Sequence, residues 1–227
     1  MDFFSHKSDF DTYIGVKSVP SEHETILMAR AEKYIQKITW IPGLRMVAVV
    51  NSLSMYATHQ GSDIDLFIIT AKNRMWLVRV LITLTFSLLW VWRKWTDIAG
   101  NFCLSFFIEE SAIDISKIAI EDDIYLYFWM YYMRPIYIVG DTYERFIQAN
   151  PGYTFLHTVS PSVPFSSENS GFFWTSVDQL FRYLLESFTQ KNYEKKWRPA
   201  WVIISDDMLK FHDADRRLYI RESLLSR

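Results

Sequence analysis

The chain has 227 residues, half of them hydrophobic, and a formal net charge of −2. This length suits one domain with an appendage, or two small domains, and the hydrophobic share is enough for a full core without disulfides. The net charge is near neutral and there is no long basic run, so the sequence has no strong signature of nucleic-acid binding.

The single cysteine, Cys103, lies in an apolar run and is predicted to be a small core residue. A lone thiol fits a reducing compartment, and residues 1–7 lack the basic start and apolar stretch of a secretory signal. We therefore expect a cytoplasmic protein. The aromatic share of 17%, with nine Trp, is high and indicates extensive aromatic packing or an oligomer surface, that is, a homo-oligomer through aromatic-rich helices.

The first predicted elements are a helix and a strand. Residues 21–39 have apolar side chains at helical spacing, and Ser21 followed by Glu24 is a capping box. The helix is expected to end before Pro42-Gly43. A short β-branched run at 45–50 then predicts a strand, which stops at Asn51-Ser52.

Residues 53–58 are predicted to form one or two helical turns. Ser52 can cap them, and the free backbone N–H groups at a helix start can bind an anion. Gly61-Ser62 then makes a turn into the next strand, predicted at 64–70.

Two carboxylates, Asp63 and Asp65, open that strand. Residues at i and i+2 share one face of a strand, and an apolar strand does not carry two charges on one face without a compensating cation. A pair of Asp carboxylates suits Mg²⁺ or Mn²⁺ completed by substrate phosphates. The alternative is a turn residue followed by a solvent-exposed charge.

A long apolar run follows, and residues 74–94 are predicted to form a helix. Its segment 75–92 has the length of a short membrane span, with Trp near both ends. A crossing there would place the strand at 64–70 and the next strand, predicted at 102–109, on opposite sides of a membrane. We therefore expect a helix that is buried against the sheet and a neighbouring chain, and a protein that does not span a membrane.

The remaining elements complete an α/β (α+β) architecture, a small mixed sheet flanked by helices with a C-terminal helical appendage. The predicted elements are a helix at 120–133, an extended piece at 135–139, and helices at 141–150 and 172–195. We expect a domain at 1–150, a linker or covering loop at 151–170 rich in Pro and Ser, and a C-terminal helix and tail at 171–227 that pack on the core.

Ser52, ten intervening residues, and then Asp63-Ile-Asp65 resemble the signature of the DNA polymerase beta-like nucleotidyltransferase superfamily. Residues 73–79, 102–107 and 123–127 are also similar to those of an uncharacterised prokaryotic group of nucleotidyltransferase-domain proteins. The resemblance covers about residues 25–150. It implies the nucleotidyltransferase fold, with Asp63 and Asp65 as catalytic metal ligands and the backbone near Ser52 as a phosphate cradle.

Two departures from that signature bear on catalysis. The motif glycine is Asn51 here, which tolerates a left-handed backbone but adds a side chain. The superfamily also takes a third carboxylate from the next core strand. Residues 102–108 contain none, so Ser105 or Asn101 would stand in, or Glu109 and Glu110 would reach back.

These observations predict a Mg²⁺- or Mn²⁺-dependent nucleotidyltransferase that binds NTP and moves an NMP to a hydroxyl of an acceptor. Protein, RNA, small-molecule and antibiotic acceptors all stay open. Asp63 and Asp65 are the expected metal ligands, and the expected nucleotide-binding residues are Asn51, Ser52, Ser62, Lys72 and Arg74. Two alternatives stay open: a nucleotide-binding or assembly module with attenuated catalysis, and a membrane-associated protein built around residues 75–92.

Overall fold

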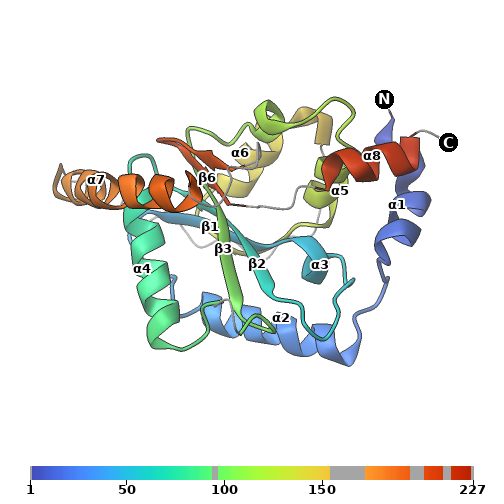
Figure 1. Cartoon of the computed structure of the whole chain (residues 1–227), viewed down its shortest axis with the longest axis horizontal. Coiled ribbons are helices and arrows are strands. Elements are labelled where there is room, and N and C mark those ends of the chain that lie inside the picture. The colour runs from blue at the N-terminus through green and yellow to red at the C-terminus, as the bar shows by residue number, and fades with distance from the viewer. Residues whose placement is uncertain (1, 94–96, 154–171, 195–201, 212–215, 226–227) are drawn as a thin grey trace.

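The computed structural model describes residues 2–93, 97–153, 172–194, 202–211 and 216–225. A six-stranded sheet of order β4-β1-β2-β3-β6-β5 forms its centre (Figure 1). The pair β2–β3 is parallel, and the other neighbouring pairs are antiparallel, which confirms the predicted mixed sheet. Its strands are β1 (Leu44–Val49), β2 (Ile64–Thr70), β3 (Phe102–Glu109), β4 (Arg134–Ile138), β5 (Ile203–Ile204) and β6 (Met208–Lys210).

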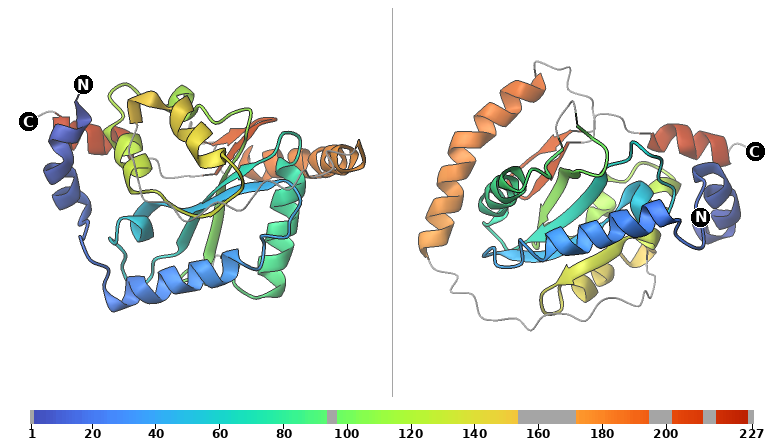
Figure 2. Two further views of the ribbon diagram at one scale, coloured as in Figure 1. Left: turned by 180° about the vertical axis from the view of Figure 1, so that it is seen from behind. Right: turned by 90° about the horizontal axis from the view of Figure 1, so that it is seen from below.

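Helices cover both faces of the sheet (Figures 1 and 2). One core cluster joins Val47 and Val49 to α2 and α4, with α7 packed beside it, and the other joins Met46 and Ala48 to α5 and α6. The side chains of β1 alternate between the two clusters because successive residues of a strand point to opposite faces. The covering helices are α2 (Glu22–Ile35), α4 (Met75–Leu88), α5 (Ile124–Tyr132), α6 (Thr142–Ala149) and α7 (Phe172–Glu194).

The strands predicted at 64–70 and 102–109 match β2 and β3, and the capping box of α2 is present. The helix predicted at 74–94 is shorter and ends at Leu88. Trp90 adopts a positive φ of 56°, and the Val91 N–H donates to the Phe86 carbonyl across the helix end. A residue in the left-handed region with this bond terminates an α-helix.

No helix in the described part of the chain is long and apolar enough to cross a membrane. One face of α4, including Trp76, Ile82 and Phe86, is buried in the core, as predicted, whereas Leu84 and Leu88 on the other face are exposed.

The C-terminal segment is part of the central sheet and not only a helical appendage. Its strand β6 pairs with β3, and β5 forms the edge. The loop predicted at 151–170 lies, from residue 154 on, outside the described residues.

The two ends of the described chain pack together (Figure 2). A third hydrophobic cluster joins Phe10 of α1 (Lys7–Ile14), Phe128 of α5, and Ile220 and Leu224 of α8 (Arg217–Leu225). Neither α1 nor α8 is among the predicted elements. Both are short, and their apolar faces are explained by packing against α5.

Candidate functional site

The acidic pair lies where β1 ends and β2 begins. Asp63 directly precedes β2, Asp65 is its second residue, and Cys103 of β3 is the registered partner of Asp65. One carboxylate oxygen of each Asp and the Cys103 Sγ all lie within 4.8 Å of one another. The i, i+2 spacing therefore places both carboxylates on one face, as predicted, and the neighbouring strand adds a thiol.

The electrostatics of this cluster are those of two acids brought close together. Burial and the neighbouring Asp63 carboxylate raise the pKa of Asp65 to about 6. Arg93 partly balances the charge, since its Nη1 donates to Asp63 Oδ2 over 2.7 Å and lies 3.5 Å from the Cys103 sulfur. The Arg93 charge and hydrogen bonds from Asn51 and Cys103 act in the opposite direction, but burial and Asp63 outweigh them at Asp65.

The third position of the cluster is Cys103, and not Ser105, which was one of the residues expected to stand in for a third carboxylate. The register of β2 with β3 shifts between Asp65 and Phe67, because β3 advances three residues where β2 advances two. Because of this bulge, the side chain of Ser105 does not follow the regular alternation of β3 side chains between the two faces of the sheet. Burial raises the pKa of the Cys103 thiol, so Cys103 is a neutral group beside the carboxylates.

Asn51 connects the turn after β1 to the acidic pair. Its φ is +58°, so the left-handed conformation expected at the motif glycine is present. Asn51 Oδ1 accepts from Trp129 Nε1 over 3.0 Å and from Tyr125 Oη over 3.4 Å, and its amide hydrogen-bonds the Asp65 carboxylate. The side chain at this position therefore orients Asp65 and ties it to α5.

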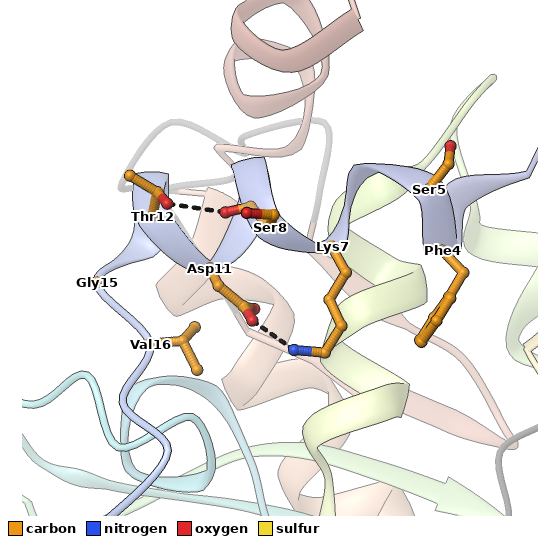
Figure 3. Close-up of a pocket in the computed structure, with 8 residues that line it drawn as sticks. All are labelled: Phe4, Ser5, Lys7, Ser8, Asp11, Thr12, Gly15 and Val16. Atoms are coloured by element: carbon orange, nitrogen blue, oxygen red, sulfur yellow. Dashed lines mark hydrogen bonds and ion pairs between the residues drawn. The ribbon is translucent and has the colours of Figure 1, made fainter.

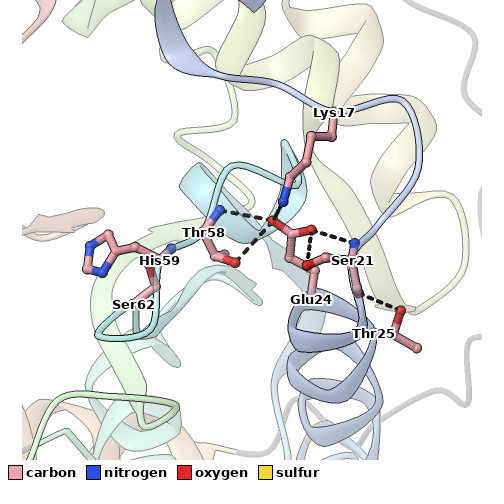
Figure 4. A network of polar contacts seen from close by, with 7 residues as sticks. All are labelled: Lys17, Ser21, Glu24, Thr25, Thr58, His59 and Ser62. Atoms are coloured by element: carbon pink, nitrogen blue, oxygen red, sulfur yellow. Dashed lines mark hydrogen bonds and ion pairs between the residues drawn. The ribbon is translucent and has the colours of Figure 1, made fainter.

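A network behind the site holds the loop that leads into Asp63 (Figure 4). The buried Glu24 accepts from the Thr58 N–H and hydroxyl, both over 3.1 Å, and pairs with Lys17 over 2.8 Å. Burial alone would raise the pKa of Glu24, but its hydrogen bonds, chiefly from Lys17, lower it to about 2. Ser62 belongs to this support, because its Oγ accepts from the His59 N–H over 3.0 Å.

The acidic pair opens on a cavity of about 850 Å³, a size that suits a small-molecule ligand. Apolar and aromatic side chains dominate its lining, and three cations from the C-terminal segment join them. The lining includes Asn51, Ser52, Asp63, Asp65, Phe106, Tyr125, Trp129, Lys210, Arg216, Arg217, Tyr219, and Tyr13 with Ile14 of α1.

The C-terminal cations are the part of the site that sequence reasoning missed. Lys210 is the registered partner of Phe106, so β6 places it one strand beyond β3, beside the cavity. Arg216 is exposed at the start of α8, whereas the Arg217 guanidinium pairs with Asp123 over 2.9 Å. From the sequence, the C-terminal tail is most simply a solvated charged segment. No spacing of residues in the sequence predicts that it lies near Asp65.

Lys72 and Arg74, predicted to contact phosphates, lie at the opposite end of β2. Roughly 17 Å of strand separates Asp65 from Thr70, after which the chain reaches Lys72. Arg74 is buried and donates to the Thr175 hydroxyl of α7 over 2.9 Å. It also packs against Gly43, where a Cβ would lie 2.6 Å from the Arg74 Cβ. Both residues are therefore too far away to contact a ligand on Asp65.

Glu109 and Glu110 cannot serve as the third carboxylate for the same reason. Glu109 is the last residue of β3 and Glu110 follows it, so both lie at the far end of the strand, where Glu109 Oε1 accepts from the Asn73 N–H over 2.8 Å. Asn101 is also committed elsewhere, because its amide donates to the Asp97 carbonyl over 3.3 Å and its oxygen accepts from Arg30.

A second concavity, of about 650 Å³, lies along α1 (Figure 3). Its charged groups are Lys7 and Asp11, which form an ion pair with each other. Asp11 also accepts from Tyr132 Oη over 2.5 Å. The charges of this concavity are thus engaged in docking α1 on α5, and no converging acidic pair lies among its lining residues.

Comparisons with protein-family models, with curated proteins and with solved structures each give no match. The geometry of the cavity and its acidic pair is therefore the basis for assigning a function.

Proposed function

We propose that this protein is a Mg²⁺-dependent nucleotidyltransferase, which moves an NMP from NTP to a hydroxyl of an acceptor. The observation that carries the proposal is the placement of Asp63 and Asp65 on the wall of a cavity that also holds Lys210 and Arg216. Carboxylates for a divalent cation, together with side-chain cations for phosphate oxygens, are what a metal–polyphosphate ligand requires.

The residues present fit one Mg²⁺ better than two. Two carboxylates with substrate phosphates suit this hard cation, whereas the neutral thiol of Cys103 is a soft ligand. Asp63 and Asp65 would hold the ion. When bound, Mg²⁺ would neutralise the phosphate oxygens and stabilise the charge that develops on them.

The chain's own groups would supply binding and orientation. Asn51 holds the Asp65 carboxylate in place, and the Glu24 network holds the loop before Asp63. Lys210 and Arg216 would attract the outer phosphates, so that the α-phosphorus faces the incoming hydroxyl. That oxygen forms a bond to the α-phosphorus and gives up its proton to solvent, the bond to the bridging oxygen breaks, and pyrophosphate leaves with the electron pair.

A nucleotide-binding module with attenuated catalysis is the second candidate. Two observations favour it: Cys103 occupies the position beside Asp65 where a third carboxylate would be expected, and the Arg93 guanidinium already pairs with Asp63. Both features lower the negative charge that is available to a second metal ion, while the nucleotide cavity is retained.

Calorimetric titration with a non-hydrolysable NTP, with and without Mg²⁺, tests the shared part of both candidates. We expect metal-dependent binding that weakens by about 100-fold in Asp63→Asn/Asp65→Asn, because both charges that hold the ion are removed. The matched control is Glu109→Gln/Glu110→Gln, which removes two carboxylates at the other end of the same strands. Equal binding by wild type and the Asp63/Asp65 variant would contradict the proposal.

Transfer of label from an NTP labelled at its α-phosphate separates the two candidates. A nucleotidyltransferase releases pyrophosphate and labels an acceptor, and both signals disappear in the Asp63→Asn/Asp65→Asn variant. A binding module retains metal-dependent affinity and gives neither signal.

A further inference from the structure

Two exposed tyrosines from opposite ends of the chain line the cavity of the acidic pair. Tyr13 is near the end of α1 and Tyr219 is in α8, and their ring centroids lie 6.5 Å apart with an interplanar angle of 54°. The exposed fractions are 40% for Tyr13 and 64% for Tyr219. Most of the Tyr219 side chain is therefore available to a ligand.

The helices that carry this pair are firmly docked. Arg217 pairs with Asp123 over 2.9 Å and donates to the Ile118 carbonyl over 2.7 Å, so the start of α8 is joined to the segment before α5. Ile220 and Phe10 lie in the same hydrophobic cluster, which joins α8 to α1. The two helices are thus held in place before any ligand arrives, which lowers the entropic cost of bringing the rings together.

Aromatic rings and cations occur together on this side of the cavity. Arg216 directly precedes α8 and is exposed, and Lys210 lies on β6. A ligand that satisfies both groups has a planar apolar part and an anionic part. Every nucleobase has a π-face that stacks on aromatic side chains, and its attached phosphates pair with Arg and Lys.

We propose that Tyr13 and Tyr219 form the stacking platform for the nucleobase of the bound NTP, and that Arg216 binds its polyphosphate. This inference rests on the proposed function, because metal at Asp63 and Asp65 fixes the phosphate end of the ligand. Because the rings are inclined by 54°, a base that stacks on the face of one ring meets the edge of the other, and the longer purine reaches both better than a pyrimidine does. We therefore expect the site to prefer purine nucleotides.

The test compares two probes, ATP and inorganic tripolyphosphate, each titrated calorimetrically with Mg²⁺. ATP has a base and tripolyphosphate has none. We expect Tyr13→Ala/Tyr219→Ala to weaken ATP binding by about tenfold and to leave tripolyphosphate binding unchanged. Arg216→Gln weakens binding of both probes. Tyr13→Phe/Tyr219→Phe keeps the rings and retains ATP affinity, and wild type binds ATP more tightly than UTP.

The matched control is Tyr183→Ala on α7, which removes a tyrosine that is 80% exposed and does not line the cavity. Undiminished ATP binding in the double Ala variant would overturn the platform, as would an equal loss of both probes. A platform that fails in this way leaves the Asp63/Asp65 dependence of ATP binding intact. Failure of the proposed function instead appears as ATP binding without that dependence.

Discussion

At the amino-terminal end of β2 and β3, Asp63 and Asp65 face a cavity, and Cys103 lies beside them. At the carboxyl-terminal end of the same strands, Glu109 lies among hydrogen-bond donors and covering helices. Both ends contain a carboxyl group with a raised pKa, about 6 for Asp65 and about 7 for Glu109, and in both the first cause is burial. A perturbed pKa by itself therefore does not distinguish a binding site from a structural one.

The difference lies in where the hydrogen bonds go. At the far end, Glu109 accepts from the Asn73 N–H and the Ser111 hydroxyl, and Asp178 of α7 accepts from the Leu77 N–H over 2.8 Å. The Leu77 N–H is one of the first N–H groups of α4, which a helix otherwise leaves unpaired, and Asn73 directly precedes the cap of that helix. At the near end, Asp65 accepts from the Asn51 side chain and not from the start of a covering helix, and it has a like charge beside it and a cavity in front of it.

The largest expected effect is on stability at the far end. Asp178→Ala removes the acceptor at the start of α4 and should lower the free energy of unfolding by about 2–3 kcal/mol. That loss corresponds to a melting temperature about 5–10 °C lower for a chain of this size. Asp178→Asn, which keeps an acceptor, is the control. If the folded Ala variant lost nucleotide affinity, the far end of the strands would also contribute to ligand binding, and the two ends would not differ as described.

Glu109→Gln tests the far end through the pH dependence of the free energy of unfolding. The pKa of Glu109 is about 7 in the folded protein and 4.5 for an ordinary Glu carboxyl, so the folded state holds the proton more tightly. The stabilisation from this group is present below about pH 4.5 and is lost as the pH rises to about 7. Urea unfolding should show a wild type that loses about 2 kcal/mol relative to Glu109→Gln between pH 5 and pH 8. A difference independent of pH would contradict this.

Asp65→Asn should raise stability while removing metal binding. At pH 7.5 the wild type ionises a half-buried carboxyl beside Asp63, so the neutral amide should gain about 1–2 kcal/mol. The gain disappears below about pH 4, where Asp65 is protonated in both the folded and unfolded states. Thermal unfolding without metal measures it. A lower melting temperature at pH 7.5 would show that Asp65 is structural, like Asp178.

Cys103→Asp adds a third carboxylate at the near end. We expect about tenfold tighter Mg²⁺ binding, together with a lower melting temperature that recovers when Mg²⁺ is added, because the extra charge repels Asp65 until the ion is present. Ser105→Asp is the comparison, since Ser105 lies at the bulge and hydrogen-bonds Cys103 and not the carboxylates, so we expect a smaller gain in Mg²⁺ affinity there. Recovery by Mg²⁺ in Ser105→Asp alone would reverse the assignment of the third position.

The smallest effect belongs to Lys72→Ala. Lys72 is exposed beyond the far end of β2, so ATP affinity should change by less than about twofold, as expected for a distant, screened surface charge. A tenfold loss would place phosphate binding at the far end.

The sequence by itself determined the features that depend on neighbouring residues. The alternation of a strand puts Asp63 and Asp65 on one face, and the turn chemistry at Asn51 gives the positive φ. The order of β1, β2, α4 and β3 also follows from local periodicity. These features need no distant contact, since backbone geometry repeats over two to four residues.

Only the tertiary structure decided which other residues meet the acidic pair. Lys72 is near Asp65 in the sequence, but each strand residue moves the chain about 3.3 Å away. Cys103 replaces Ser105 because a bulge arises from the pairing of two strands. Tyr13 and Tyr219 meet because α1 and α8 bury apolar faces on α5. A local sequence pattern does not tell which distant segments bury their apolar faces on one another. The residues on the ligand-facing wall of the site are therefore known only from the folded chain.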